Sequence, residues 1–179
     1  MKNFFILGHP RSRTAWLSTF MTYGDCFCLH EAYVHAEGID NLSDTFKLFT
    51  AFDFVGTADS GLAFYADQLL KEFPNARYVV IDRPVQDCAD SLDRIYPKVI
   101  ATTWPVSGLA KIMARPETMV VKFHELDIRK CLEIHTFCTW QEPYTHSFAF
   151  LKRLEDLDRF NIQIIPEKET AWVKRKLKL

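Results

Sequence analysis

The chain lacks an excess of either charge, a long apolar run and any internal repeat. Its 22 Lys and Arg residues nearly balance its 23 Asp and Glu residues, which gives a formal net charge of −1. Overall charge therefore gives no basis for binding nucleic acid, and any anion must be bound by basic residues placed locally. No window is apolar over the length that a bilayer requires. We expect a cytoplasmic protein that binds neither nucleic acid nor a membrane.

The chain has an odd number of cysteines. The five cysteines are Cys26, Cys28, Cys88, Cys131 and Cys138. Without a secretory context, reduced thiols are the default. The spacing of Cys26, Cys28 and His30 is compatible with a metal site, but the same alternation is what a β-strand produces. We favour the strand and expect no bound metal.

The chain does contain ample material for a single core. It has 179 residues, of which 48% are hydrophobic and 15 are Phe, so we expect one domain over residues 1–179. Short apolar runs predict strands at 3–7, 26–29, 54–57, 77–82 and 119–123. Helices are predicted at 14–23, 61–73, 84–95, 128–137 and 145–160. This alternation favours a three-layer α/β/α fold with a central parallel sheet, which binds ligands at the carboxyl ends of its strands.

The most informative segment is the loop that follows the first predicted strand. The apolar residues 4–7 are followed by a short loop that opens a helix. Backbone N–H groups and the positive end of the helix dipole meet at such a junction, where they bind anions. The residues that add positive charge or hydroxyl donors there are Arg11, Ser12, Arg13 and Thr14. The loop therefore predicts a site for phosphate or sulfate.

This loop departs from the ATP-binding pattern G-x-x-x-x-G-K-[ST], in which Lys reaches the terminal phosphates and the hydroxyl binds Mg²⁺. Gly8 matches the first Gly of the pattern. Arg13, Thr14 and Ala15 stand at the places of the second Gly, the Lys and the hydroxyl residue. A nucleoside triphosphatase without that Lys and that metal ligand is poorly equipped. Two alternatives stay open: a catalytically silent nucleotide-binding protein, which the changes at Arg13 and Ala15 favour, and a small P-loop kinase, which shares the α/β core but needs the missing Lys and Mg²⁺.

A second segment, residues 70–91, predicts a strand that leads into a helix. A turn signal and a β-branched and aromatic run at 78–81 predict a buried strand. Arg83 ends this strand, and Pro84 can begin a helix because the first helical residue needs no N–H. Ser91 then lies within the helix, away from its apolar face. This segment therefore combines a strand, an Arg at the end of that strand and a Ser within the helix that follows.

Together the two segments resemble the sulfotransferases that use 3′-phosphoadenosine 5′-phosphosulfate (PAPS). The loop is similar to the family's pattern P-[KR]-S-G-T-[TS]-W, and here it reads Pro10-Arg11-Ser12-Arg13-Thr14-Ala15-Trp16. Two positions depart from the pattern, because Arg13 replaces a Gly and Ala15 replaces a hydroxyl residue. The second segment is similar to the family's pattern R-x-P-x-D-x-x-x-S, with its Pro shifted by one place; its matching residues are Arg83, Asp87 and Ser91.

The resemblance implies a P-loop NTPase-like sulfotransferase fold, with PAPS as the sulfuryl donor and no metal. It implies that Arg83 and Ser91 bind the 3′-phosphate of the donor. It also implies that Arg11 offsets charge on the leaving nucleotide. The residues expected to bind the 5′ side are Arg11, Ser12, Arg13, Thr14, Ala15 and Trp16. Trp16 matches a residue that packs near the adenine in soluble members, and a core anchor is its equal alternative.

A general base is expected after the second predicted strand, at the edge where the acceptor should lie. Glu31 matches, by position, an acidic residue of some bacterial and carbohydrate sulfotransferases, although Ala32 replaces the Pro that often follows it. His30 is the second candidate, and His35 is a further rival.

The acceptor is expected to be a hydroxyl or amine of a small molecule or carbohydrate. Neither its identity nor the oligomeric state follows from the sequence. Several aromatic residues either line the acceptor pocket or belong to the core; they are Phe46, Phe49, Phe52, Tyr96 and Trp104.

Overall fold

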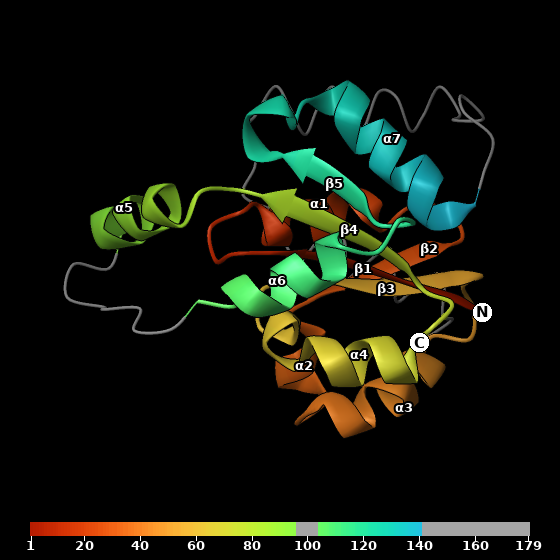
Figure 1. Cartoon of the computed structure of the whole chain (residues 1–179). Coiled ribbons are helices and arrows are strands. Elements are labelled where there is room, and N and C mark those ends of the chain that lie inside the picture. The colour runs from red at the N-terminus through yellow and green to blue at the C-terminus, as the bar shows by residue number, and fades with distance from the viewer. Residues whose placement is uncertain (96–103, 141–179) are drawn as a thin grey trace.

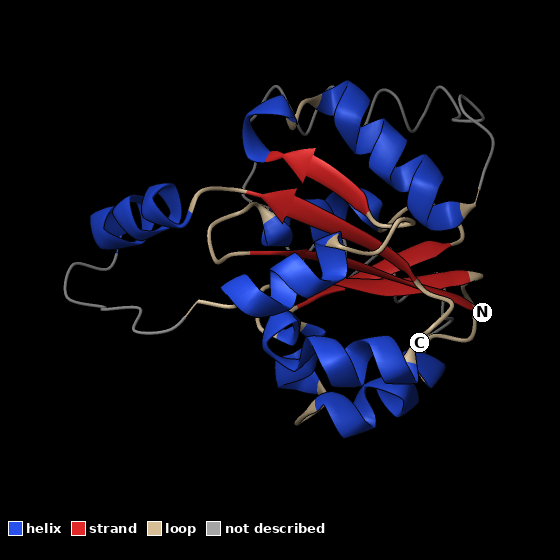
Figure 2. Cartoon of the chain, in the orientation of Figure 1, coloured by secondary structure: helices blue, strands red, loops and turns tan. Residues whose placement is uncertain are grey.

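One parallel sheet organises the chain. The computed structural model describes residues 1–95 and 104–140. The strands of the sheet are β1 (Lys2–Gly8), β2 (Cys26–His30), β3 (Phe54–Asp59), β4 (Arg77–Asp82) and β5 (Met119–Lys122). They lie in the order β2-β3-β1-β4-β5, and every neighbouring pair is parallel (Figure 2). The predicted α/β fold with a central parallel sheet is therefore confirmed.

Helices cover both faces of this sheet. They are α1 (Thr14–Met21), α2 (Ala32–His35), α3 (Leu42–Lys47), α4 (Ala66–Glu72), α5 (Val85–Ile95), α6 (Val106–Met113) and α7 (Ile128–Thr139). Three short 3₁₀ turns accompany them: η1 (Ile39–Asn41), η2 (Leu62–Tyr65) and η3 (Phe123–Glu125). Figure 1 shows α7 over one face of the sheet and α3, α4 and α6 over the other, while α5 projects beyond the ends of the strands. The result is the predicted three-layer arrangement.

The core consists of two buried clusters, one on each face of the sheet. Alternate residues of β1 supply both clusters, because successive side chains of a strand point to opposite faces. Phe46 and Phe52 are fully buried in the cluster beneath α3 and α4, and Phe49 packs against it. These three rings therefore belong to the core and not to an acceptor pocket.

The helices differ from the predicted ones in three places. The predicted helix at 61–73 is divided into the 3₁₀ turn η2 and α4, and the short helices α2 and α3 were not predicted. Helix α6 was also missed, and it packs on η2 so closely that a Cβ at Gly108 would collide with the carbonyl oxygen of Ala63. The predicted helix at 145–160 and Tyr96 lie outside the described residues.

Candidate functional site

The carboxyl ends of the strands meet at one edge of the sheet, and the predicted site residues lie along it. Strand β1 is central, with β3 on one side and β4 on the other. In α/β proteins, ligands bind beyond the strand ends at such a reversal of strand order. The loop between β1 and α1 contributes Arg11 and Arg13. Arg83 follows β4 and Glu31 follows β2, so these two residues flank the loop from opposite sides.

The loop between β1 and α1 is a tight turn with an unusual backbone. Arg11 and Arg13 have φ angles of 72° and 63°, in the left-handed region that favours glycine. The N–H of Ser12 donates to the carbonyl of His9 at 3.1 Å, which closes the turn. Arg13 is the N-cap residue of α1, and its side chain donates to the Leu126 carbonyl at 3.3 Å. Because Arg has no acceptor atom, it leaves the first N–H groups of α1 able to bind an anion.

Arg83 connects this loop to α5. One terminal nitrogen of Arg83 donates to the carbonyl oxygen of Arg11, and the other donates to the carbonyl oxygen of Asp87 at 3.3 Å. The Nε of Arg11 donates to the Oγ of Ser91 at 3.4 Å. The Nε of Arg83 is buried and has no hydrogen-bond partner within the described residues. The loop after β1 and the segment that follows β4, which the sequence analysis identified separately, therefore form one connected group.

The arginines of this group carry charge that no carboxylate balances within the described part of the chain. None of the ion pairs formed by residues 1–95 and 104–140 includes Arg11, Arg13 or Arg83. Phe123 follows β5 and stacks against two of these side chains, with its ring centre 5.2 Å from Cζ of Arg13 and 4.0 Å from Cζ of Arg83. The sequence analysis did not predict Phe123 as a site residue. The feature that could have indicated it is an aromatic residue at the end of the strand predicted at 119–123, which reaches the same edge. Clustered positive charge of this kind attracts an anionic ligand.

Glu31 lies on the other side of the loop, at the end of β2. Its φ angle of 53° is also left-handed. Its carboxylate accepts hydrogen bonds from the N–H and the Oγ of Ser60, at 3.3 Å and 2.8 Å. The Nε2 of His30 lies 3.6 Å from Oε1 of Glu31 and 3.4 Å from Oγ1 of Thr14. Burial lowers the pKa of His30, so that its ring is predominantly neutral at neutral pH. The two candidate bases are thus in contact with each other, and His30 also contacts the first turn of α1.

Asp59, the last residue of β3, holds the backbone around Glu31. It is fully buried, and one carboxylate oxygen accepts from the N–H of Tyr33 at 3.1 Å. The other oxygen accepts from the N–H groups of Gly61 and Leu62, at 2.7 Å and 3.0 Å. Burial, and then the charge of Glu31, raise the pKa of Asp59 to about 6, although these N–H donors act to lower it. Asp59 fixes the turn that carries Glu31, a positioning role that the sequence analysis did not assign.

This pKa predicts a pH dependence of stability that an Asn variant should lose. Because the pKa of Asp59 is raised from 3.8 to about 6, the folded protein binds more protons than the unfolded chain between these values. The contribution of Asp59 to stability should therefore fall as pH rises from about 4 to about 6, by about 3 kcal/mol in total, and then level off. Chemical denaturation of the wild type and Asp59→Asn across this range measures the difference. Equal pH slopes in the two proteins would refute the assignment.

The remaining predicted residues of the loop and first helical turn occupy packed or exposed positions. The Oγ of Ser12 lies 4.0 Å from the Sγ of Cys88, in the buried contact between the loop and α5. Trp16 is half-buried, stacks on Phe20 at 5.1 Å and packs against the core, which agrees with the core-anchor alternative. Ala15 is exposed on the first turn of α1.

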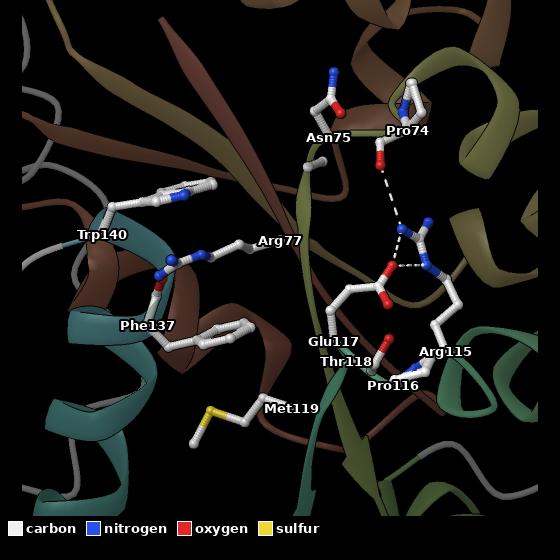
Figure 3. A pocket seen from close by; sticks show the side chains of 11 residues that line it. Pro74, Asn75, Arg77, Arg115, Pro116, Glu117, Thr118, Met119, Phe137 and Trp140 are labelled. Carbon is white, nitrogen blue, oxygen red and sulfur yellow. Dashed lines mark hydrogen bonds and ion pairs between the residues drawn. The ribbon is translucent and has the colours of Figure 1, made fainter.

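A cavity of about 610 Å³ lies at the opposite edge of the sheet, where β4 and β5 begin (Figure 3). Its two arginines already have partners. Arg77 donates to the carbonyl oxygen of Phe137 and lies 4.1 Å from the ring centre of Trp140. Arg115 bonds the carboxylate of Glu117. Among the described residues only Arg77 of this pair has no carboxylate partner, whereas the carboxyl edge combines three such arginines with the start of α1, so the carboxyl edge is the better candidate for a ligand site.

A scan against protein-family models and a search among curated proteins both find no match to this chain. Within the described residues, no helix is both long and apolar enough to cross a membrane. The same residues contain no group of three or more His, Cys, Asp or Glu side chains arranged to hold a metal ion. The geometry and charge of the carboxyl edge are therefore the features that indicate a function.

Proposed function

We propose that the protein is a sulfotransferase that moves the sulfuryl group of PAPS to a hydroxyl or amine. The observation that carries this proposal is the group formed by Arg11, Arg13 and Arg83, which lies beside the start of α1 and has no carboxylate partner in the described chain. PAPS has anionic groups at both its 5′ and 3′ positions, so its site needs cations at two separate points. Arg11 and the N–H groups at the start of α1 are the proposed first point, and Arg83 with Ser91 is the proposed second point; the bond from Arg11 to Ser91 joins the two.

The residues at this edge have the chemistry that sulfuryl transfer needs. A bond forms between the acceptor oxygen or nitrogen and sulfur, while the bond from sulfur to the bridging oxygen breaks. The electron pair of the broken bond stays on the bridging oxygen, where Arg11 and the N–H groups of α1 offset its charge. The proton of the acceptor passes to the carboxylate of Glu31, which Ser60 orients. The products are the sulfated acceptor and 3′-phosphoadenosine 5′-phosphate (PAP).

Two features favour sulfuryl transfer over the phosphoryl transfer of a small kinase. Thr14 and Ala15 stand where an ATP-binding loop carries its Lys and its Mg²⁺-binding hydroxyl. Asp59 is the carboxylate at the end of β3, the strand beside β1. Both of its oxygens already accept hydrogen bonds from backbone N–H groups, which reduces their capacity to hold Mg²⁺ or its water ligands. We therefore expect the donor to bind without Mg²⁺.

The proposed acceptor is a small molecule or carbohydrate, and the proposed location is the cytoplasm. All five cysteines are free and buried thiols, which supports a reducing compartment. The near-neutral charge of the chain gives no support for a nucleic-acid substrate.

Calorimetric titration with PAP tests the proposal. We expect the wild type to bind PAP without Mg²⁺ and more tightly than ATP or 5′-AMP, because Arg83 and Ser91 donate to the 3′-phosphate. Arg83→Ala should weaken PAP binding by about 10–100-fold and change 5′-AMP binding much less. Lys71→Ala, an exposed position on α4, is the control and should bind PAP as the wild type does.

Equal affinity of the wild type for PAP and 5′-AMP would contradict the proposal. Selective PAP binding without transfer from PAPS to any acceptor of a broad panel would instead indicate a catalytically silent nucleotide-binding protein.

A further inference from the structure

We infer that Arg13 recognises the 3′-phosphate of the donor together with Arg83, and that Phe123 positions both arginines. The inference rests on the proposed function, because it assigns a specificity-determining residue within the same site. The sulfotransferase loop pattern has Gly at the position of Arg13, so the resemblance itself gives this side chain no such role.

The side chain of Arg13 leaves the loop in the direction of β5. A terminal nitrogen donates to the Leu126 carbonyl at 3.3 Å, and the guanidinium carbon lies 5.2 Å from the centre of the Phe123 ring. The guanidinium carbon of Arg83 lies 4.0 Å from the centre of the same ring. One aromatic ring therefore holds two guanidiniums from distant segments of the chain. Each guanidinium has more N–H donors than these contacts use.

The positive charges of Arg13 and Arg83 at this ring favour the binding of one anion by both side chains. Two like charges repel each other, and none of the ion pairs within the described residues includes either arginine. Contact with the face of the ring offsets only part of this repulsion. The buried Nε of Arg83, which has no hydrogen-bond partner among the described residues, is a further donor at the same place. A phosphate carries a charge near −2 and several acceptor oxygens, so it can bond both guanidiniums at once.

The location of this pair assigns it to the 3′ end of the donor. Arg83 and Ser91 have the spacing that predicts contact with the 3′-phosphate, and Phe123 joins Arg13 to Arg83. The φ angle of Arg13 is 63°, in a region that glycine adopts with less strain.

The test compares the affinities for PAP and 5′-AMP in a set of variants. In Arg13→Gly we expect the preference for PAP over 5′-AMP to fall about tenfold, with 5′-AMP binding retained. Phe123→Leu should lower the same preference, whereas Phe123→Tyr, which keeps the ring, should preserve it. Lys71→Ala, which removes one exposed positive charge elsewhere, controls for general electrostatic effects.

The stability of the glycine variant separates binding from folding. Because glycine relieves the left-handed backbone at position 13, Arg13→Gly should raise the melting temperature by about 2–4 °C. A more stable protein with a lower preference for PAP supports the inference. An unchanged preference in Arg13→Gly, in a protein whose wild type still favours PAP, overturns the inference and leaves the proposed function standing. A wild type with no preference overturns both.

Discussion

Glu31→Gln is expected to lower the rate of sulfuryl transfer by about 10²–10⁴-fold and to leave PAP affinity unchanged. Gln has nearly the same shape as Glu, and its amide oxygen can still accept the two hydrogen bonds from Ser60. It cannot accept the proton that leaves the acceptor during transfer. Glu31 also lies on the β2 side of the loop, away from Arg83 and Ser91, so the donor should bind as before. The rate is measured as release of PAP from PAPS, with a panel of sugars, phenols and amines as acceptors.

Glu37→Gln is the matched control for this prediction. Glu37 is exposed just beyond α2 and has a φ angle of 54°, close to that of Glu31, so the same substitution is made on a similar backbone away from the strand ends. Its rate should equal that of the wild type. His30→Asn separates the two candidate bases, because the predominantly neutral ring of His30 is also able to accept a proton. Full activity of Glu31→Gln together with an inactive His30→Asn would transfer the role of base to His30.

The strands and the longer helices were predictable because each has a local signal. Strand β4 (Arg77–Asp82) was predicted with its observed bounds, since a turn precedes its β-branched run and a Pro follows its end. Helices α2 and α3 have only 4 and 6 residues, too few for a helical period to show in the sequence. Helix α6 contains Gly108, a residue that weakens a helix prediction but that close packing against Ala63 requires.

The site was predictable in part, for a reason of topology. Parallel strands end at the same edge, so the loop after β1 and Arg83 after β4 were expected to meet there, and they do. The contacts of Glu31 with Ser60 and Asp59 depend on β2 lying beside β3, a pairing that the local pattern of neither segment contains. The place of Phe123 in the site also depends on long-range strand order, because β5, which precedes it, lies beside β4 at the end of the sheet. Long-range strand order thus determined what the sequence analysis missed.

Arg11→Met is expected to lower the rate of sulfuryl transfer by about 10²–10³-fold, with a much smaller loss of PAP affinity. Charge builds on the bridging oxygen only as the bond to sulfur breaks, so a cation at this oxygen acts mainly on the transition state. Met keeps an unbranched side chain in the half-buried position of Arg11 but removes its charge and its bond to Ser91. Steady-state rates from PAPS and calorimetry with PAP, made on the same preparation, measure the two effects.

Comparing the effects of Arg11→Met and Arg83→Ala on rate and on PAP affinity distinguishes catalysis from simple anion binding. If both arginines only attract the donor, Arg11→Met and Arg83→Ala should weaken PAP binding alike and leave the rate at saturating PAPS unchanged. If Arg11 acts on the leaving group, its variant should lose rate at saturation, whereas Arg83→Ala should mainly lose affinity. Arg11→Lys should recover most of the rate, because Lys restores a positive charge at a position where the sulfotransferase loop pattern has either Lys or Arg. An Arg11→Lys variant as slow as Arg11→Met would show that charge at this position is not what accelerates transfer.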